Sequence, residues 1–216
     1  MSQDNHLQQA VLAELGWEPS VTAAHIGVTA NAGVVTLTGQ VESFSEKHVA
    51  VVAAGRVRGV KAVAEEFEVR LPFDRKRGDD DIAAAAVERL VWNTSIPRDS
   101  VAVKVEKGWL TLTGKTDWYF QKDAAGQDVR HLLGAIGLSN QIMVRPKVNT
   151  SNLSDDITHA LHRSWFFDEN NVRVSAEGGH VHLTGTVHSP HNRQTAAGTA
   201  WAAPGVTAVE NDIAIA

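Results

Sequence analysis

The chain has 216 residues, of which 43% are hydrophobic, and a formal net charge of −5. This composition is ordinary for a folded protein, and no apolar run reaches the ~18 to 20 residues that a membrane-spanning helix needs. Cysteine is absent, which excludes disulfides, thiol nucleophiles and thiolate metal sites. The polar start lacks the features of a signal peptide, so we expect a cytoplasmic protein, or a periplasmic one if a leader was removed.

The tripeptide Leu-Thr-Gly occurs three times and ends at Gly39, Gly114 and Gly185. These glycines are 75 and 71 residues apart, and the apolar residues around them recur in the same register. A second glycine follows each of them by 20 residues, at Gly59, Gly134 and Gly205. Because a long internal repeat decides the architecture, the sequence predicts three tandem domains, at 1–72, 73–150 and 151–216.

Charge is distributed unevenly over these domains. Counting Asp, Glu, Lys and Arg, residues 1–72 carry −3, residues 73–150 carry +2 and residues 151–216 carry −4. The middle domain is therefore the one best suited to approach an anionic surface. None of the three has the dense basic stripe of a nucleic-acid-binding protein, so we expect no nucleic-acid partner.

Each copy opens with a helical pattern, in which apolar residues recur at spacings of three and four. These residues are Leu7, Val11, Leu12 and Leu15 in the first copy, Ile82, Ala86, Val87 and Leu90 in the second, and Ile157, Leu161 and Trp165 in the third. Asp4, Asp79 and Ser154 precede them at the same offset and are predicted N-caps. The acidic run from Asp79 to Asp81 suits the positive end of a helix dipole better than a cation site.

A large aromatic residue stands at the same position near the end of each first helix: Trp17, Trp92 and Phe167. A repeated residue of this size is most simply a core plug, and we prefer this interpretation to a ligand platform.

Two alternating segments follow in each copy, separated by a turn that contains Gly33, Gly108 or Gly179, and they predict a β-hairpin. Alanine-rich helices are then expected at 46–56, 121–130 and 192–200, and the second repeated glycine ends each of them. A third strand follows, and the strand-helix-strand order makes it parallel to the second. The sequence thus predicts an α+β fold of three α-β-β-α-β domains, each a small three-stranded mixed sheet with two helices on one face. Gly39, Gly114 and Gly185 are expected to serve the backbone or a close approach rather than a phosphate loop.

This order of elements, with Gly-x-Val-x-Leu-x-Gly in the hairpin and Gly-Val-x-x-Val at the third strand, resembles the BON domain. The first copy carries Gly33, Val35, Leu37 and Gly39, then Gly59, Val60 and Val63, and the third carries Gly179, Val181, Leu183 and Gly185, then Gly205, Val206 and Val209. The second departs at Leu110, Ala135 and the extra Gly137. The resemblance implies a non-catalytic module of osmotic and envelope-stress proteins, one that contacts phospholipid or mediates assembly.

The copies differ most in the run Trp118-Tyr119-Phe120, whose counterparts are Ser43-Phe44-Ser45 and Ser189-Pro190-His191. Trp118 and Phe120 are therefore extra aromatic residues, and they lie near Lys115 and Lys122 in the one net-positive domain. Aromatic rings and basic groups act together at a lipid interface, which makes these four residues the candidate binding site. The alternative is that they pack against a neighbouring domain.

Six of the ten histidines lie in the third copy, where His180 and His182 share one strand face and are the candidate metal ligands. No carboxylate accompanies them at a diagnostic spacing, so we expect no metal and no cofactor. The chain also lacks a nucleophile elbow and a paired-carboxylate arrangement, which predicts that it is not an enzyme.

We therefore expect a non-enzymatic, stress-associated binding or scaffolding protein that acts on anionic phospholipid or on an envelope protein. The alternative is a cytoplasmic sensor of potassium or another cation, because backbone carbonyls can bind such ions without a side-chain signature.

Overall fold

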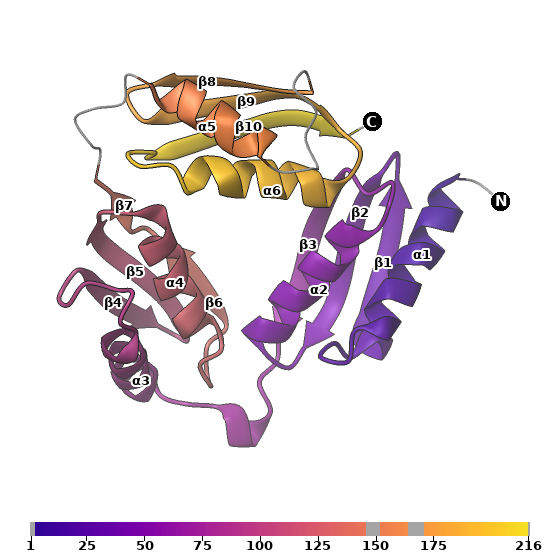
Figure 1. The fold of residues 1–216 in the computed structure, drawn as a ribbon. Helices are drawn as coiled ribbons and strands as arrows, with labels where there is room; N and C mark the ends of the chain where they lie inside the picture. The colour runs from indigo at the N-terminus through magenta and orange to yellow at the C-terminus, as the bar shows by residue number, and fades with distance from the viewer. Residues whose placement is uncertain (1–2, 146–151, 164–170, 216) are drawn as a thin grey trace. The chain divides into compact units, whose positions relative to one another are not determined.

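The computed structural model describes residues 3–145, 152–163 and 171–215, and it contains three successive copies of one α+β unit (Figure 1). The first copy consists of α1 (Gln3–Trp17), β1 (Ile26–Asn31), β2 (Val34–Val41), α2 (Phe44–Arg56) and β3 (Ala62–Val69). The second consists of α3 (Asp79–Trp92), β4 (Val101–Glu106), β5 (Trp109–Thr116), α4 (Tyr119–Arg130), β6 (Gly137–Asn140) and β7 (Met143–Val144). The third consists of α5 (Leu153–His162), β8 (Val172–Glu177), β9 (His180–Val187), α6 (Pro190–Trp201) and β10 (Ala208–Ile215). The short 3-10 helices η1 (Ala23–His25) and η2 (Phe73–Arg75) complete the described elements.

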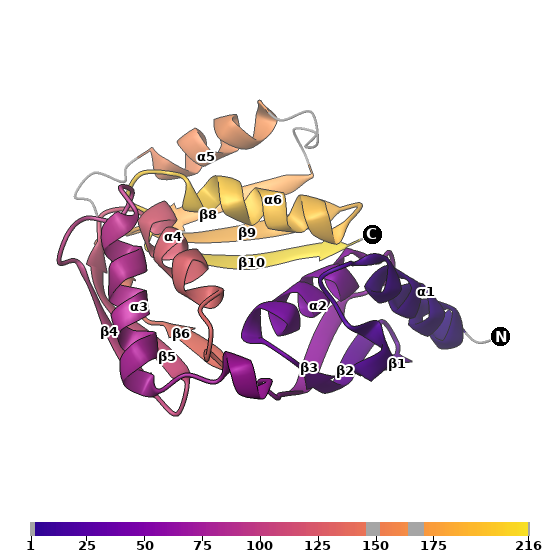
Figure 2. The same cartoon turned by 90° about the horizontal axis from the view of Figure 1, so that it is seen from below.

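The second strand is central in each sheet. In the first copy β2 pairs antiparallel with β1 and parallel with β3, and in the third copy β9 pairs in the same way with β8 and β10. In the middle copy the strand order is β4-β5-β6, and β7 continues beside β5 after a break, so the single third strand predicted there is interrupted. Both helices of a copy lie over the same face of its sheet (Figures 1 and 2). The predicted mixed sheet with two helices on one face is confirmed.

The hairpin turn has the same backbone in all three copies. Its two central residues both have positive φ, at +50° and +88° for Ala32 and Gly33 and at +51° and +79° for Lys107 and Gly108. This is the type I′ pattern, whose twist matches that of the two flanking strands. The turn therefore keeps the first and second strands in register.

The buried residues form one apolar core inside each of the outer copies. In the first copy α1 contributes Leu7, Val11 and Leu15, which pack with Val35 and Leu37 of β2. In the third copy Ile157 and Leu161 of α5 pack with Val181 and Leu183 of β9. The small side chains Ala50, Ala53 and Ala54 of α2 are buried as well, as the alanine-rich pattern predicts.

The repeated glycine near the end of each central strand permits a close backbone approach. Gly39, Gly114 and Gly185 have φ of +118°, +138° and +130°. A Cβ on them would overlap the carbonyl oxygens of His25, Ser100 and Asn171, which precede the first strands. A side chain therefore has no room at these three positions. Gly59, Gly134 and Gly205 also have positive φ and follow the second helices, as expected.

The predicted N-caps Asp4, Asp79 and Ser154 are wrong. α1 already includes Gln3, α3 begins at Asp79 itself, and the N-cap of α5 is Asn152. The three side chains instead reach across to the hairpin: Asp4 accepts from Ala32 N at 2.9 Å, Asp79 accepts from Lys107 N and Gly108 N, and Ser154 donates to Val174 O at 2.8 Å. They tie the first helix to the hairpin of the same copy.

Replacing Gly185 by alanine is expected to destabilise the third copy by about 1 to 3 kcal/mol, because the new side chain meets the Asn171 carbonyl at a strained φ. Gly198→Ala in α6 is the matched control, since nothing lies within 4 Å of its added Cβ and alanine favours a helix by about 0.5 to 1 kcal/mol. Hydrogen exchange of the β8 and β9 amides, read by mass spectrometry, should speed up in the first variant only. Equal exchange in both variants would contradict the steric role of Gly185.

Candidate functional site

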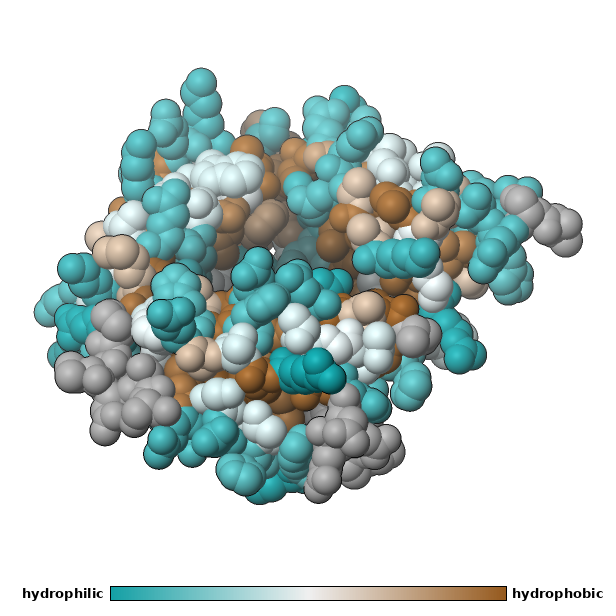
Figure 3. Space-filling model, turned by 90° about the horizontal axis from the view of Figure 1, so that it is seen from above, coloured by the Kyte–Doolittle hydropathy of each residue, from teal (hydrophilic) through white to brown (hydrophobic). Residues whose placement is uncertain are grey.

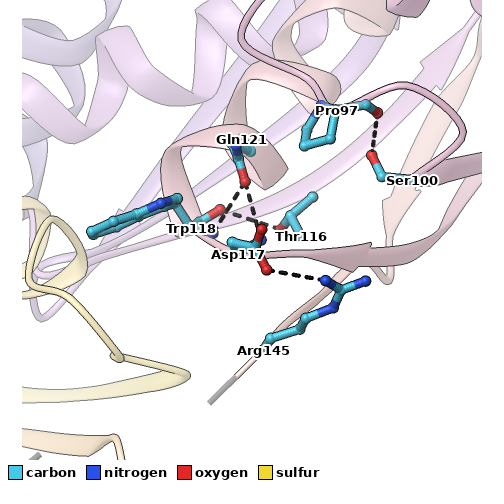
Figure 4. Close-up of polar contacts among 7 residues, drawn as sticks. All are labelled: Pro97, Ser100, Thr116, Asp117, Trp118, Gln121 and Arg145. Carbon is cyan, nitrogen blue, oxygen red and sulfur yellow. Dashed lines mark hydrogen bonds and ion pairs between the residues drawn. The ribbon is translucent and has the colours of Figure 1, made fainter. Parts of the chain in front are cut away.

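The segment between β5 and α4 of the middle copy holds the predicted aromatic residues in a defined conformation (Figure 4). Gln121 Oε1 accepts hydrogen bonds from Asp117 N at 3.1 Å and from Trp118 N at 3.2 Å. The hydroxyl of the buried Thr116 donates to Trp118 O at 3.2 Å. Trp118 is therefore fixed through both its backbone N–H and its backbone carbonyl.

The outer copies begin the same helix with a serine cap. Ser43 accepts from Glu46 N at 3.0 Å, and Ser189 accepts from Asn192 N at 3.1 Å. Trp118 stands at the position of these serines and has no oxygen to offer. The hydrogen bonds from Asp117 N and Trp118 N to Gln121 hold the helix start instead of a serine side chain. An aromatic residue therefore occupies the N-cap position that a serine occupies in the outer copies.

Glu46, the counterpart of Gln121 in the first copy, is buried and does a related task. Its carboxylate accepts from Glu42 N at 2.8 Å and from Thr22 N at 2.7 Å, which joins the start of α2 to the segment after α1. In the middle copy Gln121 accepts from Asp117 N, as Glu46 does from Glu42 N. The residue equivalent to Thr22 is Pro97, which has no N–H to donate.

The four predicted site residues lie within one short stretch at the end of β5 and the start of α4. Phe120 is 54% exposed, Lys115 is exposed, and Trp118 and Lys122 are half-buried. The rings of Trp118 and Phe120 have centroids 6.5 Å apart and are tilted by 37°. We call Lys115, Trp118, Phe120 and Lys122 the α4-start patch.

Positive charge predominates around the α4-start patch. Arg145 joins Lys115 and Lys122 there through its ion pair with Asp117, whose N–O distance is 3.2 Å. Both partners of this pair are exposed, so it adds little stability, but it keeps a third basic group at Asp117, the residue before Trp118 (Figure 4). The nearby carboxylates are those of Asp117 and Asp123.

The aromatic residues at the ends of the first helices are not core plugs, which corrects the prediction. Trp17 is 86% and Trp92 is 78% exposed, and Phe167 lies outside the described residues. At 100° per residue each tryptophan is turned by about 120° from the centre of its helix's buried face. A fixed distance of ten residues from the first apolar position therefore does not bring them to the core.

Trp17 has acidic neighbours, in contrast to the α4-start patch. Glu14 and Glu18 share the single cation Arg56, at 3.5 and 3.2 Å. The hydrogen bond from the Ser20 hydroxyl, together with the bond from Arg56, holds the pKa of Glu18 below its usual value. Because Glu18 stays charged, this end of α1 is poorly suited to an anionic surface.

Val87, predicted to belong to the buried face of its helix, is instead 52% exposed, and Val91 is 63% exposed. The alanine run before them hides which side of α3 faces the sheet, so the sequence analysis missed this apolar surface. The spacing could have indicated its exposure, because Ile82, Ala86 and Leu90 recur every four residues and form the buried face of α3 without Val87.

Gly137, where the middle copy departs from the repeat, lies beneath an aromatic ring. A Cβ at Gly137 would overlap the indole of Trp109, which is 47% exposed. The first copy has Val34 paired with Ala62 at these positions, and the third has His180 paired with Ala208. In the middle copy the large indole of Trp109 is thus accommodated by a glycine, where the outer copies have an alanine.

His180 and His182 lie on β9, and the ring of His182 contacts Asp212, whose Oδ2 is 2.9 Å from His182 Nε2. Within the described ranges no group of three or more His, Cys, Asp or Glu side chains is placed to hold a metal ion. Among those same residues no helix is both long and apolar enough to cross a membrane. In the space-filling view hydrophilic residues cover most of the visible face, with apolar ones between them (Figure 3).

The fold and the patch define a tandem array of small α+β modules whose copies share a scaffold and differ in exposed side chains. The BON domain family model matches residues 3–70, 78–146 and 149–216, and the chain belongs to this family.

Among curated proteins the chain is similar to the osmotically-inducible protein Y of Escherichia coli K12, with 27% identity over 149 residues, 66% of this chain and 73% of that protein. Solved structures of CdsD, a structural protein of the type III secretion system of Chlamydia trachomatis, match at 17% and 18% identity with a TM-score of 0.28. They cover 98% and 100% of this chain, and the matches span 92% and 100% of those chains.

Replacing Gln121 by alanine is expected to release the segment before α4, because Asp117 N and Trp118 N lose their shared acceptor. The loss should cost about 0.5 to 1.5 kcal/mol, the usual net value of such a bond. Gln121→Glu keeps the acceptor and is the control. Hydrogen exchange at Asp117 and Trp118 should rise in the alanine variant and stay close to wild type in the glutamate variant; the opposite order would contradict the assigned contact.

Proposed function

We propose that the protein is a non-enzymatic, osmotic-stress-associated binding protein that docks on anionic phospholipid through the α4-start patch of its middle domain. The observation that supports this function most directly is that Trp118 and Phe120 lie together at a hydrogen-bonded helix start, with Lys122 in the same helix, Lys115 at the end of β5 and Arg145 paired with Asp117. The association with osmotic stress follows the name of the E. coli relative.

The chemistry of the patch suits the headgroup region of a membrane. Tryptophan and phenylalanine rings gain free energy by leaving water at the interface, and basic side chains close to the surface are attracted to anionic lipid by about 1 kcal/mol each. Lys115, Lys122 and Arg145 supply this attraction in the one domain with a positive net charge. The proposed contact is peripheral and reversible.

The exposed tryptophans at the helix ends are weaker candidates for the same contact. Trp17 lies beside two glutamates that share one arginine, so it brings repulsion from an anionic surface along with its apolar area. Trp92, at the end of α3, has Arg89 alone as a basic residue in the last turn of its helix. Charge, more than aromatic exposure, separates the α4-start patch from them.

Co-sedimentation with vesicles tests the proposal. Wild type is expected to bind vesicles of mixed phosphatidylglycerol and phosphatidylcholine and to be released by added salt. Trp118→Ala/Phe120→Ala is expected to weaken binding by about tenfold or more, the result of losing 1.4 kcal/mol or more of apolar burial. Lys115→Glu/Lys122→Glu should weaken it similarly at low salt.

Trp17→Ala is the matched control, because it removes an aromatic ring that is more exposed than Phe120 from an acidic setting. It should leave vesicle binding unchanged. Absence of binding to anionic vesicles, or equal loss in the Trp17 and Trp118/Phe120 variants, would overturn the proposed site and leave a protein partner as the function of the patch.

A further inference from the structure

A small cavity lies where the linker after β3 meets the start of α2 and the segment after α4. All of its lining residues fall within residues 1–86, 104–110 and 130–139, which pack as one compact unit of the chain. Its volume is about 230 Å³, below the roughly 300 Å³ at which pockets for drug-sized ligands begin, so its occupant is small. The polar lining residues are Ser43, Ser45, Arg75, Arg130 and His131, and Leu71 and residues 132–135 form the remaining wall. We call it the linker cavity.

The lining of the linker cavity carries positive charge. Arg75 and Arg130 contribute one guanidinium group each, and the structure describes every lining residue, none of which is Asp or Glu. Glu42, outside the lining, lies 3.8 Å from Arg75, and both partners are exposed, so this ion pair is weak. The carboxylate of the buried Glu46 is directed elsewhere, to Glu42 N and Thr22 N. The cavity therefore suits an anion.

Hydrogen bonds already hold the basic groups of the cavity in place. Arg130 Nη1 donates to His48 Nε2 at 2.8 Å, so His48 is a neutral acceptor. Burial, and then the charge of Arg130, hold the pKa of His48 below its usual value, which keeps this contact intact at neutral pH. His131 Nδ1 lies 2.8 Å from Ser45 Oγ, and Nε2 of the same ring remains as a second polar atom. This side of the cavity is thus organised before anything binds.

The repeat does not require these basic residues. The second repeated glycine aligns Arg130 with Gly55 of the first copy and with Trp201 of the third. Arg75 belongs to η2, in the linker between the first and middle copies. Folding of the shared scaffold therefore does not explain why two guanidinium groups meet at this cavity.

We propose that the linker cavity binds a phosphate group, carried by a soluble phosphate compound or by a lipid headgroup. Its donors come from three segments: serine hydroxyls at the start of α2, Arg75 of the linker, and Arg130 and His131 at the end of α4. The Ser43 oxygen accepts from Glu46 N, so its hydroxyl proton can be donated to a ligand. A tetrahedral phosphate offers oxygens in several directions, and guanidinium groups bind such oxygens in pairs. A carboxylate has two oxygens in one plane and reaches fewer of these donors.

Titration of the isotope-labelled full chain with inorganic phosphate, followed by NMR, tests the proposal. Saturable shifts are expected at the amides of residues 43–46 and 130–135, with a dissociation constant on the order of 1 mM or below. Arg75→Gln should weaken binding by about tenfold or more, because a charge-assisted hydrogen bond is lost. Arg75 is exposed in the linker, so the variant should fold as wild type does.

The matched control is Arg58→Gln, which removes an exposed arginine of the first copy that does not line the cavity. It should bind phosphate as wild type does. Ser45→Ala should weaken binding by about threefold, since the bond that it removes has a neutral donor. Absence of saturable shifts up to about 10 mM phosphate, or equal weakening by Arg75→Gln and Arg58→Gln, overturns the proposal.

Vesicles of phosphatidylglycerol and phosphatidylcholine distinguish the two sources of the phosphate group. If the source is a soluble compound, Arg75→Gln binds vesicles as wild type does; if it is a headgroup, this variant loses vesicle binding and phosphate binding together. Loss of vesicle binding with an unchanged affinity for phosphate contradicts the proposal. Trp118→Ala/Phe120→Ala should keep the wild-type affinity for phosphate, so a failure of the α4-start patch and a failure of the linker cavity are told apart.

Discussion

The close approach at the end of the central strand is the constraint on which each copy depends. Gly39, Gly114 and Gly185 bring that strand against the carbonyl of the residue before the first strand, where no Cβ fits. The central strand pairs with both of its neighbours, so its position sets the register of the whole sheet. The type I′ turn fixes the other end of the same hairpin. The close approach at the glycine and the type I′ turn are both conditions on the backbone, and together they set the register of the sheet.

Once the sheet is fixed, the helix starts are free to differ. The first helix of each copy is tied to its hairpin by Asp4, Asp79 or Ser154, and none of these residues caps its own helix. The residues on the solvent side of the first helix take no part in these bonds, so they can differ between copies. At the second helix the outer copies use a serine cap, and the middle copy uses Gln121 to hold the backbone around Trp118. The half-buried Trp118 can occupy that position because Gln121 and Thr116 hold its backbone.

Periodicity and the repeated glycines were enough to predict the sheet topology and the two helices on one face, and the hairpin and third-strand motifs resembled those of the BON domain. Side-chain partners were not predictable in this way. The N-cap rule places Asp79 by its distance from the apolar run, but the amides of Lys107 and Gly108 lie within reach and take its carboxylate. The repeat shows that Trp17 and Trp92 are equivalent, and their direction away from the core could have been found from the helical angle between them and the buried residues. The exposure of Val87 was hidden by an alanine run that can face a core or water equally well.

The middle copy has the scaffold that all three copies share, and it differs most from the others in its exposed side chains. Apolar side chains are exposed on both of its helices, and their charged neighbours differ: Lys122 and Arg145 lie near Trp118 and Phe120, whereas three aspartates begin the helix that carries Val87 and Val91. Apolar area supplies attraction without direction, so the surrounding charge decides what each surface meets. Because the sheet and its glycines recur in all three copies, the copies differ in exposed and helix-start side chains, and the charge around those side chains differs from one copy to the next.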